Sequence, residues 1–151
     1  MPADYRDWVF LSSGLDMSYS EAPAMRGHSM FDNVFVDRAA WQGFQATGHW
    51  PDRTVLVMEI RGASTHGSIN KHGQYQTDER MGIEIHVRDA ARFTGGWAFF
   101  VTDGNSPAPQ VPYAADCYSC HLQHGAVDTT FAQFYPTAKA IAKKAGTFRG
   151  A

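Results

Sequence analysis

The sequence has no apolar stretch long enough to cross a membrane and no long run of charge of one sign. Its formal net charge is −2 and it has no basic stripe, so nucleic acid and anionic membrane surfaces are not expected as partners. The first residues, MPADYRDW, lack the charged-then-apolar pattern of a signal peptide. The chain is therefore expected to be either cytoplasmic or a mature form that begins with an initiator Met.

Internal repeats, low-complexity tracts and linkers are also absent, which argues against several domains. The chain has 151 residues, of which 44% are hydrophobic and 13% aromatic, enough for one core of ordinary size. We therefore predict a single domain that covers residues 1–151.

Alternation of apolar and polar residues predicts a sheet. It is clearest at 81–89, where Met81, Ile83, Ile85 and Val87 share one face and Glu84 lies on the other with its polar neighbours. Runs of β-branched and aromatic residues mark the other strands. The expected strands are 8–13, with a helical turn before it, and 32–37, 53–64, 81–89 and 96–103.

Helix signals flank these strands. Asp37 is a plausible N-cap for a helix that ends at Gly48 or before Pro51. A second helix is expected from Asp128 to the glycine at 146, kinked or restarted at Pro136. Segments 13–29, 64–79 and 104–115 are rich in turn formers and predict irregular chain, with a hairpin loop in the second. Together these elements predict an α+β fold, a mainly antiparallel sheet with flanking helices.

The two cysteines of the chain lie close together, and a histidine follows the second. Cys117, Cys120 and His121 form C-Y-S-C-H, the pattern of c-type haem attachment. The two thiols add to the haem vinyl groups, and the adjacent imidazole is placed under the iron as axial ligand. A thioredoxin-like dithiol normally opens a helix in a βαβ unit, which is not found here. A zinc site that includes His124 remains an alternative, although zinc ligand pairs are usually further apart.

No methionine follows residue 120; all six precede the cysteine motif. A small electron-transfer cytochrome commonly has this motif near its start and a Met ligand far downstream. Here most of the chain precedes the motif, and we expect it to build a pocket around the haem. This order favours a five-coordinate iron with an open face. Covalent haem attachment also implies an export route, so we expect the periplasm, with the signal peptide removed.

The chain resembles the cytochrome P-460 family, which includes the β-type cytochromes c′. The resemblance covers nearly the whole length, in the family's order, on the segments YRDWVF, NVFVDRAAWQGFQATGHWPDRTVLVMEI, MGIEIHVRDAARF, GGWAFF and CYSCHLQHGAVDTTFAQFYP. It implies a mainly antiparallel β fold with helices, a homodimer, one haem c and a five-coordinate iron on His121. Family members either oxidise hydroxylamine or bind small gases such as NO and CO.

Met58 stands where the family's enzymes carry a lysine that forms a covalent cross-link to the porphyrin edge. A thioether cannot form that amine link, so the resemblance does not extend to the cross-link. Lys71 is the nearest lysine, but it does not match the motif position. For Met58 itself there are three interpretations: packing in the core beside the haem edge, a sulfur–iron bond, and some other covalent or oxidised form.

Glu84 matches the carboxylate that the family's enzymes place above the haem to accept protons. The alternative is a solvated strand face with a local ion pair. Asp32 stands where some enzymes carry an arginine. The other histidines, among them His86, show no metal-ligand spacing and are expected at the surface or in loops.

These observations predict a periplasmic cytochrome with one covalently attached haem, which binds or slowly converts NO, hydroxylamine or related ligands. One alternative is an active hydroxylamine oxidoreductase of the cytochrome P-460 type. Another is a six-coordinate electron-transfer cytochrome. A redox partner cytochrome is compatible with each of the three.

Overall fold

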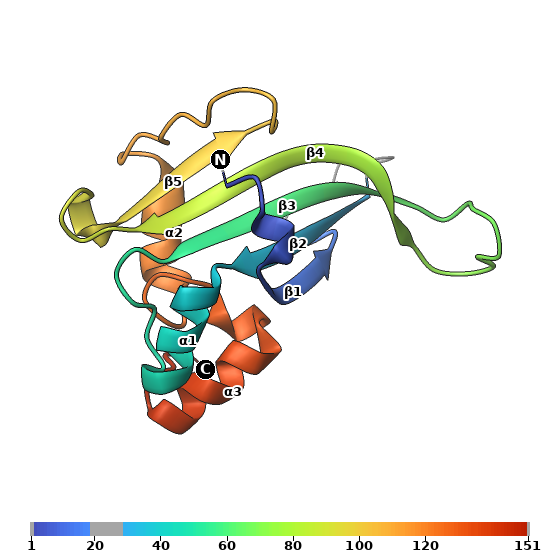
Figure 1. Cartoon of the computed structure of the whole chain (residues 1–151). Helices are drawn as coiled ribbons and strands as arrows, with labels where there is room; N and C mark the ends of the chain where they lie inside the picture. Colours follow the sequence, from blue (N-terminus) through green and yellow to red (C-terminus); the bar gives the residue numbers. More distant parts are fainter. Residues whose placement is uncertain (1, 19–28, 151) are drawn as a thin grey trace.

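The structure, a computed structural model, describes residues 2–18 and 29–150. Its centre is a five-stranded antiparallel sheet whose spatial order follows the sequence (Figure 1). The strands are β1 (Val9–Leu15), β2 (Met30–Val36), β3 (Val55–Ser64), β4 (Tyr75–Arg88) and β5 (Trp97–Thr102). With the helices, this sheet confirms the predicted α+β fold. Residues 19–28 of the predicted irregular segment lie outside the described residues.

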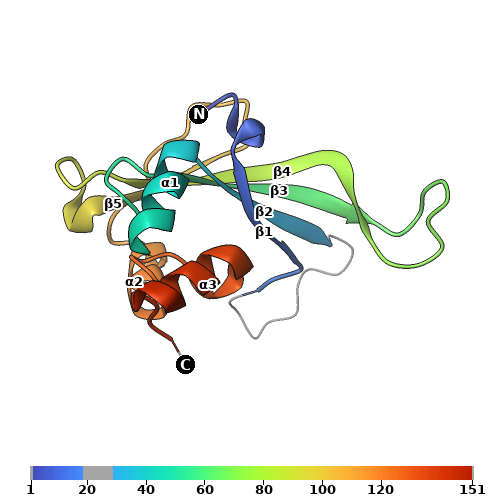
Figure 2. The same cartoon turned by 60° about the horizontal axis from the view of Figure 1, so that its bottom comes forward.

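Three helices, α1 (Arg38–Thr47), α2 (Asp116–His124) and α3 (Pro136–Ala145), gather near one end of the sheet, while the β3–β4 hairpin extends beyond the other (Figures 1 and 2). Helices α1 and α3 and one face of the sheet share an apolar core, whereas α2 has no buried residue. The buried members of this core are Leu11, Val34, Val36, Ala40, Phe44, Trp50, Leu56, Trp97, Ala126, Val127, Ala132, Ala138 and Ala142.

Helix α1 begins and ends where the sequence predicts. The Asp37 carboxylate accepts a hydrogen bond from the Ala40 N–H at 2.8 Å and a second from the Val55 N–H at 2.9 Å. It therefore caps the helix and ties its start to β3. Gly48 ends the helix in the left-handed conformation, φ 75°, which glycine adopts without a steric cost.

The predicted helix from Asp128 onward is wrong in its first half. Asp128 (φ 46°) and Thr129 (φ 65°) are left-handed and cannot continue a right-handed helix. A 3₁₀ turn follows at Ala132–Phe134, and α3 begins at Pro136, whose missing N–H is tolerated only in a first turn. Helix α2 was not predicted, because the cysteine motif carries no strong apolar periodicity.

The other face of the sheet holds a second buried cluster around Tyr5 and a buried carboxylate, Glu59, which is 2% exposed. Arg6 donates to Glu59 through Nε at 2.9 Å, Arg61 donates at 2.7 Å, and the Tyr5 hydroxyl also donates. Burial raises the pKa of Glu59, but the hydrogen bonds from Arg61, Tyr5 and Arg6 outweigh it and bring the pKa to about 2. This network fixes the N-terminal segment to β3.

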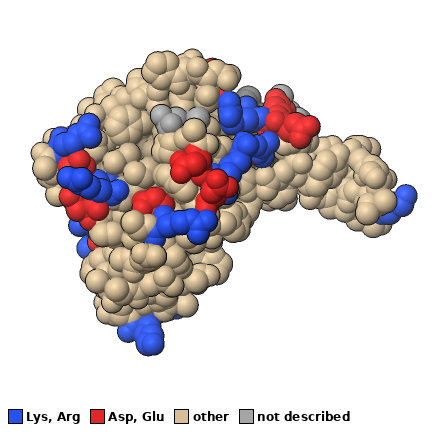
Figure 3. Space-filling view, in the orientation of Figure 1, with Lys and Arg blue, Asp and Glu red and all other residues tan. Residues whose placement is uncertain are grey.

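Acidic and basic side chains are mixed over the face seen in Figure 3, with no large patch of either sign. This agrees with the absence of a basic stripe in the sequence. Within residues 2–18 and 29–150, no helix is long and apolar enough to span a bilayer.

Candidate functional site

A pocket of about 150 Å³ lies on the helix-covered face of the sheet. Strands β1 to β5 form one wall, and α2 with residues 131–135 forms the other. Its aromatic lining comes from Phe99, Phe131, Phe134 and Tyr135. Its titratable lining residues are Asp32, Glu84, His86 and His121. An apolar pocket with a few convergent polar groups is the usual form of a ligand site.

Helix α2 carries the cysteine motif beside this pocket. Residues at i, i+3 and i+4 share a helix face, so Cys117, Cys120 and His121 lie on one side of α2. Both cysteines are free thiols, the first exposed and the second half-buried. Tyr118, between them, accepts from the Phe99 N–H at 3.3 Å and donates to the Val111 carbonyl at 3.0 Å. Tyr118, one of the two residues between the thiols, thus docks the helix on β5.

The His121 ring is oriented by a backbone carbonyl and by a neighbouring aromatic ring. Its Nδ1 lies 2.7 Å from the carbonyl oxygen of Thr129, which can only accept, so Nδ1 carries the proton. The ring stacks on Phe131, with centroids 4.1 Å apart. Burial lowers the pKa of His121, although the hydrogen bond to Thr129 opposes it. The ring is therefore neutral, and within the described residues its Nε2 has no hydrogen-bond partner, leaving a lone pair free to bind a metal.

Met58 and Glu84 are direct partners across β3 and β4, and both line the pocket with His121. The structure therefore brings these three sequence-predicted residues together, with the two cysteines on the adjoining helix. Lys71 lies in the hairpin loop between Ser64 and Tyr75, outside the pocket lining. Among the described residues that line the pocket, none is a lysine.

Two carboxyl groups face the pocket. Glu84 lines the pocket at a solvent-exposed position of β4, and partial desolvation by the surrounding protein raises its pKa. Asp32 lies on the same face, on β2. Burial, followed by the nearby charges of Glu84 and Asp16, raises its pKa to about 6. The pocket therefore holds two groups that exchange protons closer to neutral pH than ordinary carboxylates do.

The prediction that His86 lies at the surface or in a loop is wrong. It is 8% exposed, and its ring lies 4.0 Å from that of Phe99 and 5.1 Å from that of His121. Its Nε2 is buried without a hydrogen-bond partner, and desolvation, with a smaller contribution from His121, holds its pKa well below the usual range. Strand periodicity was the missed signal, since His86 is two residues from Glu84 and on the same face.

These features define a class of site. A neutral imidazole with a free Nε2 lies beside two free thiols at haem-attachment spacing, against an apolar aromatic pocket. The unpartnered Nε2 of His86 is a further polar atom that a ligand in this pocket can satisfy. This donor set fits a haem.

Comparison with known protein families leads to the same class of protein. The sequence profile of the cytochrome P-460 family matches residues 2–132 of the 151-residue chain. The chain therefore belongs to the cytochrome P-460 family and is a haem-binding cytochrome. A search of curated proteins found no significant match.

Proposed function

We propose that this cytochrome carries one haem c, attached through thioether bonds to Cys117 and Cys120, with His121 as the axial ligand of a five-coordinate iron. The observation that carries the proposal is the hydrogen bond from His121 Nδ1 to the Thr129 carbonyl, which leaves Nε2 as the donor atom beside the two thiols. Metal-binding histidines are usually oriented in this way.

We propose that the protein binds or slowly converts small nitrogen ligands such as NO and hydroxylamine. When bound, the haem iron supplies the redox and ligand-binding chemistry. The chain supplies the axial nitrogen, the aromatic walls that exclude water, and Glu84, whose raised pKa suits it to accept a proton at its carboxylate oxygen. Asp32, on the same face, provides a second acceptor.

The family's lysine cross-link is not expected to form. Met58 occupies the corresponding position, and its thioether packs against the apolar core. An active hydroxylamine oxidoreductase is therefore the less favoured function. A six-coordinate electron-transfer cytochrome has one supporting observation, the unpartnered His86 Nε2 in a pocket that also contains Met58.

The remaining proposals concern the location, the domain organisation and the oligomeric state of the protein. We place the protein in the periplasm, because covalent haem attachment implies export, and we regard residues 1–151 as one domain. We also propose a homodimer, supported by large apolar side chains at exposed positions of β1: Phe10 is 55% exposed and Leu15 is 42% exposed. Light scattering combined with size exclusion tests the dimer; a single monomeric peak at micromolar concentration would contradict it.

The optical spectrum of the protein, with mass spectrometry of its haem peptide, tests the central proposal. We expect a five-coordinate high-spin spectrum and a haem attached through two thioethers only. A reduced Soret band far to the red, with a third covalent bond, would instead support the oxidoreductase. A low-spin six-coordinate spectrum would support the electron carrier. The double variant Cys117→Ser/Cys120→Ser tests the thioether attachment, and its haem should be released into acidified solvent.

A further inference from the structure

The carbonyl that orients His121 belongs to a strained turn. Val127 and Thr130 are bridged, with the Thr130 N–H donating to the Val127 carbonyl at 2.7 Å. The two residues between them, Asp128 and Thr129, both have positive φ, as in a type I′ hairpin. For a β-branched residue such as Thr129 this conformation is unfavourable, so the surrounding structure has to hold it.

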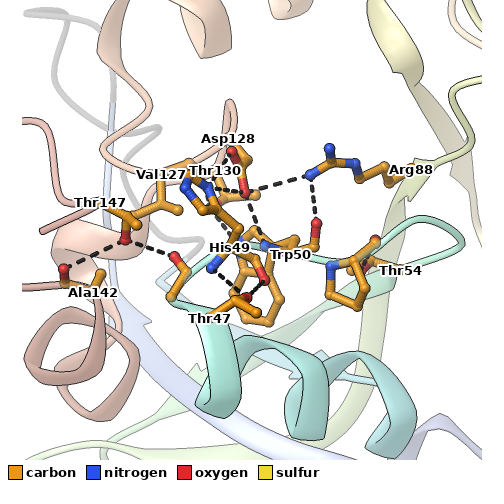
Figure 4. Close-up of polar contacts among 12 residues, drawn as sticks. Thr47, His49, Trp50, Thr54, Arg88, Val127, Asp128, Thr130, Ala142 and Thr147 are labelled. Carbon is orange, nitrogen blue, oxygen red and sulfur yellow. Dashed lines mark hydrogen bonds and ion pairs between the residues drawn. The ribbon is translucent and has the colours of Figure 1, made fainter. Parts of the chain in front are cut away.

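Thr129 itself supplies no polar anchor, because its hydroxyl is buried without a hydrogen-bond partner. Its neighbour Asp128 supplies most of the polar contacts that hold the turn (Figure 4). The Asp128 carboxylate, 14% exposed, accepts from the Trp50 N–H at 2.8 Å and lies 3.0 Å from His49 Nδ1. It also pairs with Arg88 of β4 at 3.4 Å.

The other side of the turn is held by the same segment. The Trp50 indole N–H donates to the Thr130 hydroxyl at 2.8 Å, and that hydroxyl donates to the Val127 carbonyl at 2.7 Å. Arg88 also donates to the Trp50 carbonyl. The segment after α1 therefore forms hydrogen bonds to both sides of the turn. Arg88 connects these contacts to β4, the strand that carries Glu84.

We propose that Asp128 is a positioning residue for the iron ligand. By anchoring the turn to Trp50, His49 and Arg88, it fixes the direction of the Thr129 carbonyl and thereby the orientation and donor strength of His121. This inference rests on the proposed role of His121. A hydrogen bond from the far nitrogen of a ligating imidazole makes it a stronger donor, which favours ferric over ferrous iron.

The test compares the haem-loaded variants Asp128→Ala and Asp128→Asn with the wild type. Asp89→Ala is the matched control, because the Asp89 carboxylate is 18% exposed, accepts from two backbone N–H groups and pairs with Arg92. The readouts are the reduction potential and the iron–imidazole stretching band of the ferrous form in resonance Raman spectra.

We expect Asp128→Ala to weaken the preference of His121 for ferric iron about tenfold. This change raises the potential of the one-electron couple by about 59 mV. The iron–imidazole band should move to lower frequency. Asp128→Asn keeps an acceptor for the Trp50 N–H and should shift both readouts in the same direction by less, while Asp89→Ala should shift neither.

Unchanged potential and band in both Asp128 variants would overturn the proposal, as would an equal shift in Asp89→Ala. If Asp128→Ala does not fold, the comparison of Asp128→Asn with the control decides. A wild-type protein with no haem, or with no iron–imidazole band, would overturn the proposed function together with this inference. That outcome differs from an unchanged band in haem-bearing variants, which refutes the role of Asp128 alone.

Discussion

Met58 and Glu84 lie directly opposite one another across β3 and β4, on the face of the sheet that meets α2. Their side chains share the pocket with His121, although 26 and 37 residues separate Glu84 from the other two in sequence. A residue at position 58 therefore lies next to a candidate proton acceptor.

Met58→Lys places an amine at the position where the family's enzymes form their cross-link. We expect a new covalent bond to the haem, detected as a cross-linked haem peptide by mass spectrometry and as a reduced Soret band moved to the red. Met81→Lys is the matched control, since Met81 is 37% exposed and lies outside the pocket lining. A Met58→Lys protein with an unmodified haem would contradict the proposed proximity of residue 58 to the porphyrin edge.

Glu84→Gln removes the proton acceptor while keeping the shape of the side chain. We expect any hydroxylamine oxidation to slow by about 100-fold, the usual contribution of a positioned acid or base. Affinity for NO should change far less, because NO carries no proton to transfer. The measurements are steady-state turnover and NO titration, with Glu79→Gln on the exposed part of β4 as control. Equal turnover in wild type and Glu84→Gln would remove Glu84 from the mechanism.

Asp32 predicts a specific pH dependence. Its pKa is raised from 3.8 to about 6 in the folded protein, so between these values the folded state binds more protons than the unfolded state. Stability from this group is then complete at low pH and is lost as the pH rises through about 6. Asp32→Asn should abolish that loss and raise the free energy of unfolding at pH 7 by about 1 kcal/mol, after allowance for solvent screening.

Denaturant unfolding of Asp32→Asn at a series of pH values measures this effect. Asp78→Asn, which removes an exposed carboxylate from the same sheet, controls for net charge. The stability curves of the two variants should diverge between pH 3.8 and about 6 and keep a constant separation above that. A constant separation across the whole pH series would show that Asp32 is not destabilised by its surroundings.

Glu59 predicts the opposite behaviour. Because its pKa is depressed to about 2 in the folded state, it stabilises the protein above the ordinary carboxylate pKa, and the contribution is lost as the pH falls toward 2. Glu59→Gln should cost about 3 kcal/mol at neutral pH, since it leaves Arg61 without its charged partner. Chemical denaturation at pH 7 measures the loss, and a cost below about 1 kcal/mol would mean that solvent replaces the ion pairs.

Much of the fold could be predicted because its signals are local. Asp37 and Gly48 delimit α1, and alternation at 81–89 identifies the buried face of β4 from a few neighbouring residues. The cysteine motif is equally local, since its chemistry fixes its spacing. These features need no knowledge of distant contacts.

The features that were missed depend on distant contacts. The left-handed pair Asp128–Thr129 is held by Trp50 and Arg88, which come from elsewhere in the chain. The local sequence pattern alone predicted a helix there. The burial of His86 depends on the packing of α2 over β5. The pairing of β3 with β4 includes two register shifts, between Ile60 and Arg61 and between Arg61 and Ala63, which no alternation pattern specifies.

The β3–β4 hairpin places its loop at the end of the sheet away from the helices (Figure 1). Exposed loop tips of this kind tolerate inserted sequence. The loop at residues 65–74 is thus a natural attachment point for a surface tag or an electrode linker. A cytochrome immobilised there would present its haem-binding end to the solution, which suits the protein to use as a sensor for dissolved small ligands.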